Sequence, residues 1–119
     1  MLIKAARSWP SLRQHQLQFR ACDDGALAAG YSEAVTRLLA DRWHTFGQFA
    51  VLARTFPAFR HWALGHIDAS GSEEDLRRIV RNAADCAAAK AEAQLCHDVQ
   101  HAASDALREL APGGPSSAP

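Results

Sequence analysis

Two histidines and an aspartate near the C-terminus have the spacing of side chains that share one face of a helix. His97, His101 and Asp105 follow one another at four-residue steps, so in an α-helix they would lie one above the other. Two imidazoles one turn apart are a common way for a helix to offer a metal ion two ligands. The segment lacks the glutamate of an HExxH zinc motif and the Glu-x-x-His pairs of di-iron bundles. We therefore prefer a polar face in contact with water, and keep a metal- or cofactor-binding protein as the alternative.

A second candidate site is a segment from Arg42 to Ile67 that contains no acidic residue. Its basic residues alternate with aromatic ones, a mixture that can bind single-stranded nucleic acid through phosphate contacts and base stacking. The aromatic residues have helical spacing, however, and a small domain needs their buried area, so we interpret them as core. The basic residues then leave a surface patch for an acidic partner, or for the chain's own acidic half; it consists of Arg42, Arg54 and Arg60. Nucleic-acid binding through these arginines is the weaker alternative.

The sequence gives little support to nucleophilic catalysis, phosphate binding or acid–base catalysis. No serine lies in a nucleophile-elbow or SxxK context, and there is no glycine-rich phosphate loop. The acids at 73–75 follow Ser72 directly, which is the arrangement of a capped helix start with acids on the positive end of the helix dipole. We predict no catalytic residues and no cofactor.

Cys86 and Cys96 are ten residues apart in a stretch whose composition favours helix throughout. In one continuous helix their Cα atoms would be about 15 Å apart, whereas a disulfide needs about 4.4–6.8 Å. If the chain reverses between them, they can face each other, either as a disulfide or as a pair of buried free thiols. A redox or metal dithiol lacks the close CxxC spacing. Cys22 is left over, as an inert buried thiol or one that forms a dimer.

The apolar pattern around these cysteines indicates that the chain does reverse. A stripe of apolar residues running from Leu76 to Ala83 extrapolates onto Lys90 and Gln94 at 3.6 residues per turn. The apolar residues downstream lie elsewhere, at Leu95, Val99, Ala102, Ala106 and Leu110. The phase has slipped by about one residue, or about 100°. The slip predicts a turn within 87–91 that joins two antiparallel helices.

Upstream, start signals and apolar spacing predict four more helical segments. A short first helix follows Ser8 and Pro10, a turn is expected at 23–25, and a long helix spans 26–43. Thr45 and Gln48 match a capping box, in which the threonine hydroxyl accepts the backbone N–H of the glutamine. Pro57 then opens a new helix, because proline has no N–H to donate within an existing one.

A set of residues spread over 22–103 resembles a group of small, mostly uncharacterised helical bacterial proteins that often carry an export signal. The likeness is carried by Cys22-Asp23-Asp24-Gly25-Ala26, Phe59, His66-Ile67-Asp68-Ala69, Asp75-Leu76, Ile79, Asn82-Ala83, Cys86 and Leu95-Cys96. It brings no catalytic motif. It implies an oxidising compartment, periplasmic or extracellular, and a Cys86–Cys96 disulfide; without the bridge we expect a cytoplasmic protein. Residues 1–7 lack the apolar stretch of a signal peptide.

The whole chain of 119 residues is long enough for one domain with a modest core. We expect an N-terminal extension at 1–7, a helical domain at 8–111 and a disordered Pro/Gly/Ser tail at 112–119. The predicted fold is all-α, an irregular or orthogonal bundle of five to six helices without a β-sheet. Its core is the aromatic segment 43–62, packed on Leu38/Leu39, Leu76/Ile79/Val80 and Leu95/Val99.

The distribution of charge along the chain also bears on function. The formal net charge is zero, but residues 1–60 carry net +4 and residues 61–119 net −4. This asymmetry can orient a partner or pair one half with the other. No window is apolar enough to span a bilayer. We therefore predict a non-enzymatic interaction module that binds a protein partner or associates with itself.

Overall fold

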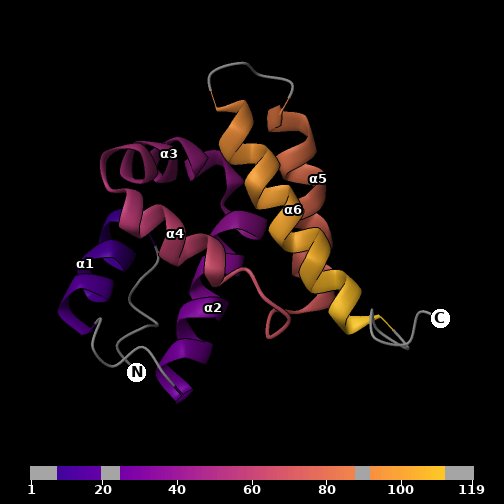
Figure 1. Ribbon diagram of the computed structural model, residues 1–119, viewed down its shortest axis with the longest axis horizontal. Coiled ribbons are helices and arrows are strands. Elements are labelled where there is room, and N and C mark those ends of the chain that lie inside the picture. Colours follow the sequence, from indigo (N-terminus) through magenta and orange to yellow (C-terminus); the bar gives the residue numbers. More distant parts are fainter. Residues whose placement is uncertain (1–7, 20–24, 88–91, 112–119) are drawn as a thin grey trace.

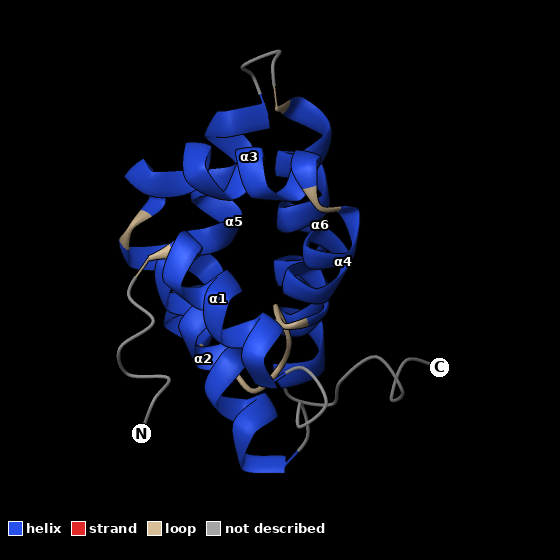
Figure 2. Ribbon diagram, turned by 90° about the vertical axis from the view of Figure 1, so that its left-hand side faces the viewer, coloured by secondary structure: helices blue, strands red, loops and turns tan. Residues whose placement is uncertain are grey.

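The computed structural model describes residues 8–19, 25–87 and 92–111, and these fold into helices with no strand among them (Figures 1 and 2). The elements in chain order are α1 (Trp9–Phe19), α2 (Gly25–Asp41), the 3₁₀ turn η3 (Trp43–Thr45), α3 (Phe46–Thr55), α4 (Pro57–Gly65), α5 (Glu73–Ala87) and α6 (Ala93–Leu110). The predicted all-α fold of five to six helices is confirmed. The expected N-terminal extension, turn at 23–24 and C-terminal tail lie outside the described residues, as does Cys22.

The helices form two groups that meet across α2 and α4. Helices α5 and α6 make an antiparallel hairpin on one side of the molecule, and α1 and α3 lie on the other (Figure 1). Between them, α2 packs along α5, and α4 packs on both α3 and α6. Within the described residues, none of the helices is long and apolar enough to cross a membrane.

The core is the aromatic cluster that the sequence predicts. Phe46, Phe49 and Phe59 are buried together with the leucines and valines expected to contact them. Two large residues outside the predicted core segment join them. Trp9 of α1 is fully buried and stacks on Phe49 at 4.3 Å between ring centroids, and Tyr31 of α2 is also fully buried. The Trp9–Phe49 contact attaches α1 to α3 and buries apolar area from both helices.

The chain reversal predicted within 87–91 is confirmed, because α5 ends at Ala87 and α6 begins at Ala93. The two helices run side by side in opposite directions (Figure 1). Cys86 and Cys96 face each other and form a disulfide, with their Cα atoms 5.9 Å apart. The free-thiol alternative therefore does not describe this structure.

The start of α5 also forms as predicted. The Ser72 hydroxyl accepts the backbone N–H of Asp75 at 3.1 Å, and three acids occupy the first turn. At Pro57 the chain leaves α3 and begins α4, since Phe56 adopts an extended conformation with φ −129° and ψ 88°. An extended residue before proline is what the proline ring requires.

The expected capping box at Thr45 is wrong. Thr45 does precede α3, but its hydroxyl donates to the carbonyl oxygen of Arg42 at 2.7 Å and makes no capping bond to Gln48. The reason is the 3₁₀ turn, which leaves Thr45 at φ −95° and ψ 8° instead of the extended geometry of a side-chain cap. The same turn ends the preceding helix at Asp41, two residues earlier than the sequence predicts.

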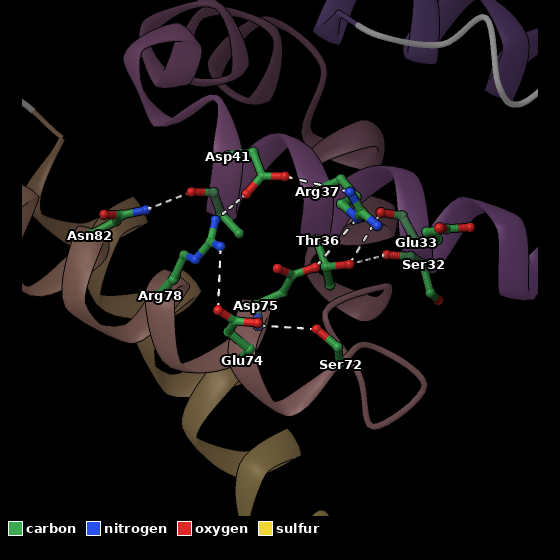
Figure 3. A network of polar contacts seen from close by, with 11 residues as sticks. Ser32, Glu33, Thr36, Arg37, Asp41, Ser72, Glu74, Asp75, Arg78 and Asn82 are labelled. Carbon is green, nitrogen blue, oxygen red and sulfur yellow. Dashed lines mark hydrogen bonds and ion pairs between the residues drawn. The ribbon is translucent and has the colours of Figure 1, made fainter.

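A network of polar contacts joins α2 to α5 (Figure 3). Arg37 of α2 pairs with Asp75 of α5, and Arg78 of α5 pairs with Asp41 at the end of α2. The Asn82 side chain donates to the carbonyl oxygen of Leu39 at 3.1 Å. That carbonyl is one of the four at the end of α2 that lack a partner within the helix. The network therefore fixes where the end of α2 meets the middle of α5.

Candidate functional site

The histidine pair of the predicted metal site lies on the outer face of α6. His97 and His101 are exposed, and His101 Nδ1 is 3.4 Å from Asp105 Oδ2. Asp105 also pairs with Arg108. In the part of the chain that the structure describes, no three His, Cys, Asp or Glu side chains are grouped so as to hold a metal ion. The metal site stays a prediction that rests on spacing alone.

Two of the three arginines of the predicted patch form ion pairs within the chain. Arg54 donates to Glu92 Oε2 at 2.9 Å, and Arg60 pairs with Asp98. Both acids belong to the N-terminal end of α6 and the residue before it. Arg42 is exposed and forms no ion pair with any described residue. Two of the arginines thus bind the chain's own acidic half, which is one of the two roles that the sequence allows.

A polar cluster inside the fold unites residues that no sequence motif connects. Ser32 of α2 is 2% exposed, and its hydroxyl donates to Asp68 Oδ2 at 2.9 Å. His66 Nδ1, at the end of α4, lies 2.8 Å from the same hydroxyl oxygen. The signal in the sequence was the position of Ser32 between apolar residues on the inner face of α2.

This Ser–His–Asp cluster does not have the order of a catalytic triad. A hydroxyl has one proton, and Ser32 gives it to Asp68, so its oxygen accepts from His66 Nδ1–H. In a triad the histidine accepts the serine proton and the carboxylate binds the histidine. Here both side chains bind the serine, which is buried. The cluster ties α2 to the turn after α4 and is structural.

One half of the molecule carries no acidic residue. Helices α1, α3 and α4 and the turn η3 contain no Asp or Glu, and we call these four elements the acid-free half. The acids of the described residues lie on α2, α5, α6 and the turns beside them. In Figure 2, the side formed by α1 and α3 faces the viewer. The charge asymmetry of the sequence is therefore also a separation in space.

The α3–α4 corner is the apolar surface of this half, and it consists of Val51, Thr55, Phe56, Pro57 and Ala58. All five are exposed and uncharged, and Val51 and Phe56 are 51% and 38% exposed. The sequence wrongly places Phe56 in the core as the next residue of the α3 stripe. The extended conformation before Pro57 ends the helical period at this residue, so its ring leaves the inner face of α3.

Arg13 of α1 lies against this corner. Its guanidinium carbon is 3.5 Å from the centroid of the Phe56 ring, a cation–π contact. Its Nε is buried and has no hydrogen-bond partner. Among described residues Arg13 forms no ion pair, and one turn further along α1 lies another exposed apolar residue, Leu17. The sequence does not indicate the contact between Arg13 and Phe56, because the two residues are 43 positions apart.

A second surface feature is an open hollow of about 430 Å³ between the first turns of α5 and the last turns of α6. Its apolar lining includes Val80, Leu107 and Leu110. Its charged lining includes Arg77, which already pairs with Glu73. Nothing in this lining resembles a catalytic group of residues.

The geometry stands alone as evidence of function, because comparison with models of protein families, with curated proteins and with solved structures finds no match for this chain.

Proposed function

We propose that this chain is a non-enzymatic module that binds another protein through the α3–α4 corner. The observation that carries the proposal is that five uncharged residues of the corner are exposed, a valine and a phenylalanine among them. Four of the five are consecutive, and Val51 lies one helical turn before them. Single apolar residues are common on protein surfaces, whereas a group of them is typical of an interaction site.

The surroundings of the corner support the proposal. Interface centres are depleted in charge and enriched in aromatic residues and arginine, and this corner presents Phe56 with Arg13 stacked on it. The polar side chains elsewhere that could serve in catalysis or binding make contacts within the fold. Ser32 and Asp68 hold two elements together, and Arg54 and Arg60 pair with α6.

The test is site-specific photo-crosslinking in the native source. A photoreactive amino acid replaces Val51 at the corner or, as the matched control, the exposed Ala84 on α5. We expect a discrete crosslinked protein from position 51 and none from position 84. The captured protein is then purified and titrated against the wild-type chain and Val51→Ser. Equal crosslinking at both positions, or equal affinity for both chains, would contradict the proposal.

A further inference from the structure

We infer that the partner's contact segment is acidic and amphipathic, and that one of its carboxylates binds Arg13. This inference rests on the proposed function, since it names the kind of partner that the α3–α4 corner fits. Its basis is the combination of an arginine to which no described residue supplies a counterion, an exposed aromatic ring beneath it, and the absence of acids from the acid-free half.

Arg13 has one side-chain atom, Nε, that no described residue satisfies. Nε is buried without an acceptor, and the described residues supply no carboxylate to the guanidinium. Nε itself is out of a partner's reach, but Arg13 as a whole is only partly buried. A carboxylate that binds its terminal guanidinium nitrogens gains more there than it would at a fully hydrated arginine. The planar guanidinium presents several N–H donors in a fork that matches the two oxygens of a carboxylate.

The position of Phe56 also favours a carboxylate at Arg13. Its ring covers one face of the guanidinium and holds it in place, so binding a carboxylate along the edge costs less side-chain freedom. Beyond the ring, Val51, Pro57 and Ala58 offer apolar surface with no charge. The partner segment therefore needs an acid for Arg13 and apolar side chains for the corner, as on an amphipathic acidic helix.

A second copy of this chain fits less well. Two corners related by a two-fold axis would place the acid-free half of one copy against that of the other, so neither Arg13 would gain a carboxylate. A head-to-tail contact with the acids of α5 would supply a carboxylate, but it would build rings or open chains instead of a closed dimer. Nucleic acid also fits less well, because its affinity comes from several phosphate contacts, and Arg54 and Arg60 already pair with acids.

The experiment uses a synthetic helical peptide as the probe, labelled with a fluorophore and followed by anisotropy. Leucines lie at helical spacing on one face of the peptide, and glutamates fill the other. One control peptide replaces every glutamate by lysine, and another replaces every leucine by serine. We expect the acidic peptide alone to bind the wild-type chain, more weakly as the salt concentration rises.

The variants locate the binding site. Arg13→Gln should weaken binding by about tenfold or more, and Arg13→Lys, which keeps the charge without the fork, should fall between it and wild type. Arg81→Gln, an exposed arginine on α5, is the matched control and should bind like wild type. Circular dichroism and urea titration check that each variant is folded.

The inference is overturned if the acidic peptide does not bind, if the lysine peptide binds equally well, or if Arg13→Gln binds as wild type does. These results differ from a failure of the proposed function. A partner that crosslinks at position 51 through a segment without acids would sustain the function and remove the acidic segment. The absence of any specific crosslink at position 51 would remove both.

Discussion

The hydroxyl of Ser32 joins α2 to the turn after α4 inside the fold. It donates to Asp68 and accepts from His66, and it is almost fully buried. Ser32→Ala removes this hydroxyl, and with it the hydrogen bonds that the partly buried Asp68 carboxylate and His66 imidazole make to it. We expect the free energy of unfolding to fall by about 1–3 kcal/mol, measured by urea denaturation.

The matched control for Ser32 is Ser70, which binds the other oxygen of the same carboxylate. Ser70 is exposed, so water replaces its hydroxyl in the Ser70→Ala variant. We expect a change within about 0.5 kcal/mol for that variant. A loss of stability as large as that of Ser32→Ala would show that burial is not the cause of the Ser32 effect.

The contacts of single residues were the hardest features to predict from the sequence. The aromatic core followed from helical spacing, because Phe46 and Phe49 lie on the buried side of α3 and Phe59 on that of α4. Phe56 did not, since the residue before a proline leaves the helix, and its contact with Arg13 joins α1 to the end of α3. The Ser32 cluster likewise depends on a tertiary contact between α2 and the end of α4, which no local pattern encodes.

At the scale of elements, the hairpin of α5 and α6 was predictable because an apolar stripe changes phase when a chain reverses. The start of α5 was predictable from Ser72 and the acids that follow it. The 3₁₀ turn before α3 was not, since Thr45 carries the sequence of a cap but a backbone conformation set by the turn. Local motifs are therefore dependable where the neighbouring backbone is regular, and fail at irregular joints.

The disulfide that closes the hairpin gives a prediction at this scale. Cys86 and Cys96 enclose a short loop, and cross-linking it restricts the unfolded chain. In a Cys22→Ala background, adding Cys86→Ala and Cys96→Ala should lower the free energy of unfolding by about 2–3 kcal/mol. Urea denaturation of the oxidised parent chain and of the variant measures the difference.

Thiol counting supplies the check on this prediction. The parent chain, oxidised and then unfolded, should show no free thiol in the Cys22→Ala background. Reduction of that chain with a dithiol should reproduce the loss of stability seen in the double-alanine variant. Two free thiols in the oxidised chain, or no change in stability on reduction, would contradict the disulfide's contribution.

At the scale of the whole molecule, the charge asymmetry of the sequence has two consequences. Arg54 and Arg60 bind Glu92 and Asp98 across the boundary between the acid-free half and the hairpin. The remaining arginine of the acid-free half, Arg13, forms no ion pair with a described residue. From the sequence, the asymmetry could either orient a partner or pair one half with the other. Which arginine serves which role could not be predicted, because this depends on how α4 packs on α6.

The Arg60–Asp98 pair tests how much this internal pairing stabilises the fold. Both side chains are about one-third exposed, so we expect a coupling energy of about 0.2–1 kcal/mol. A double-mutant cycle of Arg60→Ala and Asp98→Ala, measured by urea denaturation, isolates this coupling. The local Arg77–Glu73 pair within α5 is the control, and its coupling should be smaller because it is more exposed. Added salt should weaken both. A cycle with no coupling at low salt would mean that apolar packing alone joins the two halves.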